Sequence, residues 1–109
     1  MEVELPKILH VDDEADIREV ARLALETVGG LNLVQCATGL EALEVAPEQL
    51  PDLFLLDLMM PDMDGIQTLK KLLEMPAFER TPAFFMTARA SDKDKQVLLH
   101  NGAAAVIAK

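Results

Sequence analysis

Cysteine and long apolar runs are nearly absent from this sequence. Cys36 is the single cysteine among 109 residues, which excludes an internal disulfide and fits a reducing compartment. No run approaches the roughly 20 apolar residues needed to cross a bilayer. The acidic start, Met1 to Pro6, also lacks the apolar stretch of a signal peptide. These absences predict a cytoplasmic protein without a membrane segment, in which Cys36 is a small core residue.

Basic residues are scarce as well. The chain has 10 lysines and arginines against 19 aspartates and glutamates, and its formal net charge is −9. This balance argues against direct binding to nucleic acid or to an anionic membrane surface. Half of the residues are hydrophobic, so a chain of this length can build the core of one domain without disulfides.

Two kinds of apolar segment alternate along the chain. Short apolar runs predict strands, and longer segments with apolar residues three and four positions apart predict helices. We expect strands at 7–11, 33–37, 53–57, 83–87 and 104–108, and helices at 14–28, from 38 to about 47, 65–75 and 92–101. Such alternation indicates an α/β domain with a parallel sheet and crossover helices.

Residues at the expected helix ends add detail. Asp13 should cap the first helix, and Thr38 with Glu41 has the spacing of a capping box at the second. Pro47 should end or kink that second helix, because proline lacks a backbone donor and its ring clashes with the preceding turn. Gly102 should stop the fourth helix.

Polar residues stand at the carboxyl ends of four expected strands. Asp57 ends the third strand, an apolar run in which a buried charge is costly unless something pairs with it. The others are Asp12 and Asp13 after the first strand, Thr87 at the end of the fourth and Lys109 after the fifth. In an open α/β sheet the carboxyl edge is where sites form, so we expect these residues to make one site.

The residue types at this edge suit phosphoryl chemistry. Three carboxylates that converge repel one another unless a cation joins them, and oxygen ligands select a hard metal, Mg²⁺ first. Lys109 would add a positive charge and Thr87 a hydroxyl. Asp57 could then act as a nucleophile and form an aspartyl phosphate. Positioning and charge neutralisation would supply most of the catalysis.

These residues, in this order and spacing, resemble the receiver domain of two-component response regulators. The resemblance covers the whole chain and rests on Val11-Asp12-Asp13-Glu14, on residues 56–65 (Leu-Asp-Leu-Met-Met-Pro-Asp-Met-Asp-Gly), on Thr87-Ala88 and on Lys109. It implies a flavodoxin-like, doubly wound sheet of five parallel strands in the order 2-1-3-4-5, as in the chemotaxis member of the family.

The resemblance also implies roles. Asp57 would take a phosphoryl group from a histidine kinase or phosphotransfer protein, and the domain would catalyse only its own phosphorylation and dephosphorylation before acting on a downstream effector. Asp13, Asp57 and the backbone carbonyl of Met59 would ligate Mg²⁺, with Asp12 acting through water. Thr87 and Lys109 would contact the phosphoryl oxygens. In the family, the side chains at Met59 and Arg89 control access of water to the phosphate.

The sequence departs from the family pattern in two places. Val106 stands where the family usually has an aromatic switch residue, and neither the proline nor the final helix that follows the family lysine is present. Only the first helix would then cover its face of the sheet. We expect residues 1–109 to be a receiver domain whose natural chain continues with an amphipathic helix. A protein ending at Lys109 should be unstable or self-associate as a homodimer through the bare face.

Two other functions are compatible with parts of this pattern. A pseudo-receiver would bind partners without being phosphorylated, although every acidic and phosphate-contacting residue is present. An aspartate-nucleophile phosphatase of the haloacid-dehalogenase type is the other. Such enzymes need an acid two residues after the nucleophile, where this chain has Met59, and they carry a cap domain for which the chain is too short.

Overall fold

The structure is a computed structural model that describes residues 6–88 and 91–108. Arg89 and Lys109, for which the sequence predicts roles, lie outside the described residues. The elements are β1 (Lys7–Val11), α1 (Ala15–Arg22), the π-helical segment η1 (Leu23–Val28), β2 (Asn32–Cys36), α2 (Gly39–Gln49), β3 (Leu53–Asp57), α3 (Gly65–Leu73), the 3₁₀ turn η2 (Pro76–Phe78), β4 (Ala83–Thr87), α4 (Asp92–His100) and β5 (Ala105–Ala108).

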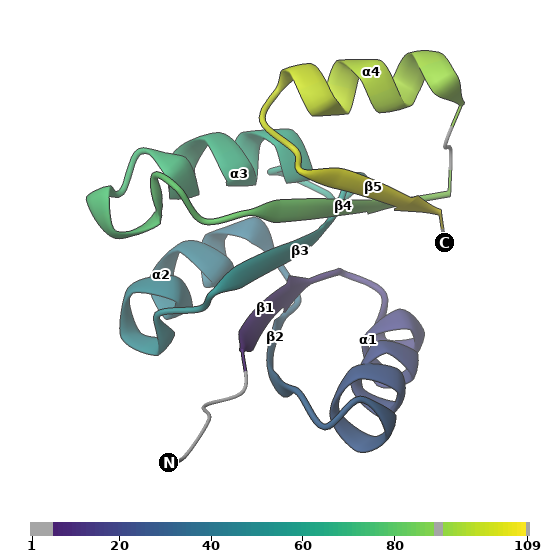
Figure 1. Ribbon diagram of the computed structural model, residues 1–109, viewed down its shortest axis with the longest axis vertical. Helices are drawn as coiled ribbons and strands as arrows, with labels where there is room; N and C mark the ends of the chain where they lie inside the picture. Colours follow the sequence, from purple (N-terminus) through teal and green to yellow (C-terminus); the bar gives the residue numbers. More distant parts are fainter. Residues whose placement is uncertain (1–5, 89–90, 109) are drawn as a thin grey trace.

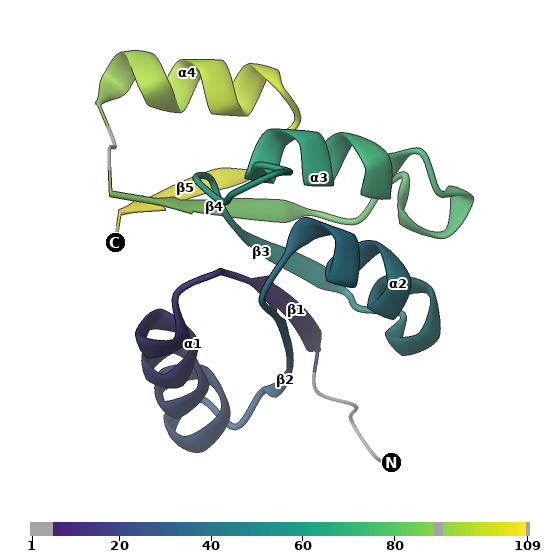
Figure 2. The same ribbon diagram turned by 180° about the vertical axis from the view of Figure 1, so that it is seen from behind.

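The strands form one parallel sheet in the order β2-β1-β3-β4-β5, which confirms the expected flavodoxin-like topology. Helices α2, α3 and α4 lie on one face of this sheet, and α1 lies on the other (Figures 1 and 2). A parallel sheet requires such crossover helices, because each strand must return to the same end before the next begins. The carboxyl ends of all five strands therefore meet at one edge.

The first helix differs most from its prediction. Instead of one helix over 14–28, α1 passes at Leu23 into the wider turns of η1. Asp13 does not cap it. The N-cap is Glu14, which makes no capping bond with its side chain, and Asp12 Oδ1 accepts a hydrogen bond from Glu14 N at 2.9 Å. An aspartate two residues before the N-cap therefore closes this turn, as aspartates often do.

The other helix ends follow the sequence more closely. Thr38 Oγ1 accepts the expected bond from Glu41 N at 3.1 Å. Helix α2 continues two residues past Pro47, because a proline in the last turn removes only the bond of its own nitrogen. Leu50, in a left-handed conformation with φ of 49°, then ends this helix. Gly102, with φ of 103°, follows α4 as expected.

Smaller differences concern one or two residues at an element end. Strand β2 begins and ends one residue earlier than expected, and β5 begins one residue later. Helix α3 ends at Leu73 rather than at residue 75, because the chain turns there toward η2, which begins at Pro76. Strands β1, β3 and β4 have their predicted bounds.

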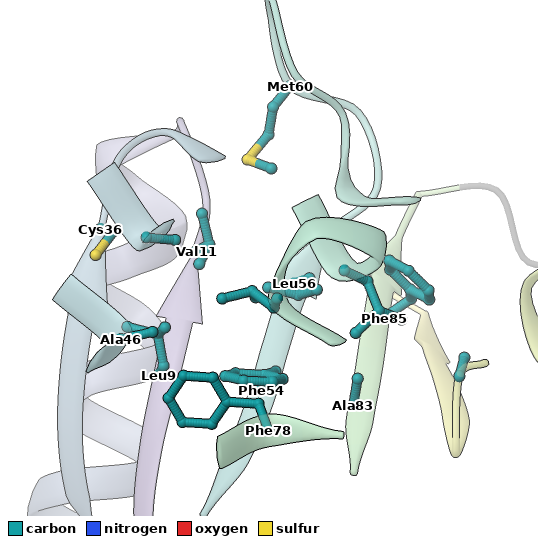
Figure 3. Close-up of a cluster of buried hydrophobic side chains, with 14 of the residues drawn as sticks. Leu9, Val11, Cys36, Ala46, Phe54, Leu56, Met60, Phe78, Ala83 and Phe85 are labelled. Carbon is teal, nitrogen blue, oxygen red and sulfur yellow. The ribbon is translucent and has the colours of Figure 1, made fainter. Parts of the chain in front are cut away.

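The main hydrophobic core lies between the sheet and helices α2, α3 and α4. Figure 3 shows its centre, where Phe54 and Phe78 meet edge to face with ring centroids 5.4 Å apart. Cys36 belongs to this cluster, as predicted. Burial, and to a lesser degree the negative charge of Glu41, raises the pKa of the Cys36 thiol to about 12.

The opposite face has a smaller core. Its buried residues are Ile8, Leu33 and Leu55, and no residue of α1 is buried. A groove of about 350 Å³ runs between this helix and the strands and is lined by Ile17, Val20, Ala21, Ala24, Leu25, Leu55, Met86, Ile107 and Ala108. The predicted exposure of apolar side chains on this face is clearest at Ile107, of which 42% is exposed.

Candidate functional site

Asp57 lies at the carboxyl end of β3, where the following loop folds tightly against the strand. Its neighbour Leu58 donates a backbone hydrogen bond to Met86 O at 3.0 Å and accepts one from Gly65 N at 2.9 Å. A Cβ at Gly65 would collide with the carbonyl oxygen of Asp57, so only glycine permits this approach of α3 to the strand. The packing leaves 2% of Asp57 exposed.

Strand register brings Asp12 beside Asp57. Val11 on β1 is in register with Leu56 on β3, so the next residue of each strand lies at the same level of the sheet edge. Asp12 is fully buried, whereas Asp13 and Glu14 in the turn that follows are exposed. One carboxylate oxygen from each of Asp12, Asp13, Glu14 and Asp57 lies within 4.8 Å of the others. The predicted acidic cluster is therefore present, with Glu14 as an additional member.

Thr87 completes one wall of a hollow beside Asp57. Because Asp57 is in register with Met86 on β4, Thr87 stands one residue further along the neighbouring strand. The hollow has a volume of about 440 Å³ and is lined by Glu14, Asp57, Leu58, Met59, Thr87, Ala88 and Asp94. Met59, which also lines the hollow, has 75% of its surface exposed and so lies at its rim. On the last strand, Ala108 is in register with Thr87.

The donor set of this cluster fits a hard cation. All four groups are carboxylates, and a cluster with oxygen donors and no imidazole or thiolate suits Mg²⁺ or Ca²⁺ better than zinc. Four carboxylates this close repel one another, and a divalent cation relieves that repulsion. The structure therefore supports a metal site whose ligands come from the turn after β1 and from the end of β3.

Three residues near this site were not predicted from the sequence. Glu14 could have been found, because it directly follows the two aspartates. Asp94 comes from the first turn of α4 and reaches the hollow through the tertiary fold. Arg18 on α1 donates a hydrogen bond from Nη1 to the backbone oxygen of Asp12 at 2.7 Å, a contact that no local spacing indicates.

Two neighbouring positions and the helix lengths complete the description. Asp64 caps α3 in a capping box with Gln67. Val106, which stands at the usual aromatic position, is partly buried and packs against the main core. None of the described helices is long and apolar enough to cross a membrane.

Curated relatives share much of this sequence. An uncharacterized 14.6 kDa protein of Leptolyngbya boryana is 38% identical over 95 residues, which are 87% of this chain and 72% of that protein. Response regulator Rre1 of Synechocystis sp. is 36% identical over 102 residues, which are 94% of this chain and 44% of Rre1. The chain thus spans less than half the length of Rre1.

Solved structures and the family model agree with these relatives. The chemotaxis protein CheY4 of Vibrio cholerae superposes with a TM-score of 0.89 at 30% identity, covering 96% of this chain and 87% of that one. The N-terminal domain of a response regulator receiver protein from Methanoculleus marisnigri superposes with a TM-score of 0.87 at 34% identity. The superposition covers 97% of this chain and 85% of that domain. The sequence model of the response regulator receiver domain family matches residues 8–109 of this chain. The chain therefore belongs to that family.

Proposed function

We propose that this chain is a phosphoaccepting receiver in which Asp57 takes a phosphoryl group from the phosphohistidine of a histidine kinase or phosphotransfer protein. The observation that carries the proposal is the position of Asp57. Its carboxylate belongs to a cluster of four acids within 4.8 Å and opens on the hollow that Thr87 also lines. A nearly buried nucleophile between a cation site and a hydroxyl donor suits phosphoryl transfer, which depends mainly on positioning and charge neutralisation.

In this reaction a carboxylate oxygen of Asp57 attacks phosphorus. A P–O bond forms as the P–N bond to the donor histidine breaks, and the departing imidazole keeps the electron pair and takes a proton from water. The Thr87 hydroxyl donates to a phosphoryl oxygen, and family resemblance assigns a second contact to Lys109. Asp13, Asp57 and the backbone carbonyl of Met59 would hold Mg²⁺, with Asp12 acting through water, and the ion would neutralise charge on the phosphoryl group.

The consequence of phosphorylation is a change in a partner-binding surface. Thr87 ends β4, so a shift of its hydroxyl toward the phosphoryl group moves the chain that follows this strand. A cytoplasmic effector, or another part of a longer protein, would read that change. The domain would act catalytically on itself alone, by gaining and losing its own phosphate.

The direct test is phosphorylation by a small phosphodonor. The parent protein, incubated with acetyl phosphate and Mg²⁺, should gain the mass of one phosphoryl group, and peptide mapping should place it on Asp57. Asp57→Asn is the matched control, because it keeps the size of the side chain and removes the nucleophile. Chelation of the metal should also stop the reaction. A parent protein that gains no mass under these conditions would be a pseudo-receiver.

The lifetime of the phosphate gives a second test of the same site. Met59 stands at the exposed rim of the hollow and cannot orient an attacking water. Asparagine at this position can, so Met59→Asn should speed loss of phosphate several-fold, and combining it with Arg89→Ala should speed it further. Rates measured after rapid removal of the phosphodonor decide this, and a double variant with the parental rate would contradict the role of the rim.

A further inference from the structure

Three polar residues connect the sheet to α1 beneath the acidic cluster. Gln35 on β2 contacts two of its neighbours through Nε2. This nitrogen lies 2.7 Å from the backbone oxygen of Arg18 on α1 and 3.1 Å from Nδ1 of His10 on β1. His10 is fully buried, and both Gln35 and Arg18 are partly buried. The contacts thus join three separate elements on the face that α1 covers.

The chemistry of the groups determines which atom donates. The backbone oxygen of Arg18 can only accept, so the amide of Gln35 must present its nitrogen there. The same NH₂ group then donates to Nδ1 of His10, and the neutral ring carries its proton on Nε2. Gln35 therefore has a defined orientation, in which one side-chain amide contacts both the backbone of α1 and the His10 ring.

Arg18 extends this connection to the site. Its Nη1 donates to the backbone oxygen of Asp12 at 2.7 Å. The backbone nitrogen of Asp12 in turn donates a hydrogen bond to Cys36 O on β2 at 3.1 Å. The backbone of Asp12 is thus held between the neighbouring strand and the guanidinium group, while its Oδ1 receives Glu14 N.

We infer that Gln35 and Arg18 are positioning residues for the metal site. Gln35 holds α1 where the Arg18 side chain can hydrogen-bond to the turn that follows β1. This turn carries Asp12, Asp13 and Glu14. This inference rests on the proposed function, since it concerns how well that site binds Mg²⁺. Four carboxylates that repel one another tend to push the backbone of this turn away from β3. The hydrogen bond from Arg18 to the backbone of Asp12 opposes this movement. Groups that orient metal ligands without touching the metal commonly change its affinity about 10- to 100-fold.

Gln35→Met tests this inference without changing the charge of the protein. Methionine has the length of glutamine but cannot donate to either oxygen or imidazole. The Mg²⁺ dissociation constant, measured by calorimetric titration with Mg²⁺ alone, should rise about 10-fold, the lower end of that range. At saturating Mg²⁺ the phosphorylation rate should return to that of the parent, because Gln35 does not touch the reacting atoms.

Val34→Ala is the matched control for a loss of stability alone. Val34 is the neighbour of Gln35 on β2 and packs into the main core on the other face. This variant should lower the unfolding midpoint and leave the Mg²⁺ dissociation constant unchanged. Equal weakening of Mg²⁺ binding by both variants would show that Gln35 acts through general stability and would overturn the inference.

Arg18→Lys provides a second route if Gln35→Met folds poorly. Lysine keeps the positive charge but lacks the planar fork that reaches the Asp12 carbonyl, so Mg²⁺ binding should weaken in the same direction. Parental affinity in either folded variant, within twofold, refutes the positioning role. A parent protein that itself binds no Mg²⁺ refutes instead the proposed function, so the two failures are distinguishable.

Discussion

The two faces of the sheet are built differently. On one face, helices α2, α3 and α4 bury a large cluster that includes Leu9, Phe54 and Phe85. On the other face, α1 buries none of its own residues, and the core consists of Ile8, Leu33 and Leu55 beside the polar contacts of Gln35. The first face therefore buries the larger apolar cluster, and we expect it to contribute more to stability than the second face.

Strand alternation explains why the buried carboxylates of the site, Asp12 and Asp57, belong to the thinner face. Successive side chains of a strand point to opposite sides of the sheet. On β1, Leu9 and Val11 join the main core, so Ile8, His10 and Asp12 belong to the α1 side. The same alternation on β3 places Asp57 on the side of Leu55. The side chains of Asp12 and Asp57 are therefore on the same side of the sheet as α1, whose Arg18 donates a hydrogen bond to the backbone of Asp12.

Matched phenylalanine truncations should show the largest contrast between the faces. Phe54 is fully buried against Phe78, and Phe54→Ala should cost about 3–5 kcal/mol of unfolding free energy. Phe84 on β4 is only partly buried and packs on the α1 side. Phe84→Ala should therefore cost about 1–2 kcal/mol of unfolding free energy. Urea denaturation measures both. Equal losses would mean that the α1 face contributes as much stability as the other.

Mg²⁺ should stabilise the fold through the acidic cluster. A metal that binds only the native state adds about 2.7 kcal/mol at 100 times its dissociation constant. Asp13→Asn should relieve carboxylate repulsion, raise the melting temperature without metal and abolish phosphorylation. Thermal unfolding with Mg²⁺ and with chelator checks this. An unchanged parental melting temperature together with a destabilised Asp13→Asn would show that the cluster is not a metal site.

Some features of the fold and the site could be predicted from the sequence, and others could not. The bounds of β1, β3 and β4 could be predicted because an apolar run ends there at a polar residue. The grouping of Asp12 with Asp57 followed once their strands were neighbours, and the family resemblance supplied that order. The contact between Gln35 and Arg18 could not be predicted, because it depends on how α1 lies over β2 rather than on any periodic pattern along the chain.

The groove on the α1 side should make a polypeptide of residues 1–109 bind hydrophobic dye and self-associate. Ile107→Ser should reduce both while changing the unfolding free energy by less than about 1 kcal/mol, because Ile107 is already partly exposed. Leu40→Ser is the control, since Leu40 is 59% exposed on α2, outside the groove. Dye fluorescence and sedimentation measure the outcome, and equal effects of the two variants would contradict a specific role of the groove.

The reactivity of a cysteine on each face compares how accessible the two faces are, and it should disturb stability least. Cys36 is buried on the main-core side and has a pKa raised to about 12 by burial, so at pH 8 it should react with a thiol reagent only when the protein opens. A cysteine placed in the groove by Ala24→Cys, in a protein whose Cys36 is replaced by alanine, should react immediately.

The raised pKa also sets the direction of the pH dependence. Below about pH 9 the thiol is neutral in both states and has no effect. Between about pH 9 and pH 12 the unfolded chain loses the Cys36 proton first, so unfolding should become easier as the pH rises through this window. Cys36→Ala should remove that part of the pH dependence. Rapid labelling of Cys36 in the folded parent at pH 8 would show that the main-core face opens as readily as the groove, and the contrast between the two faces would no longer hold.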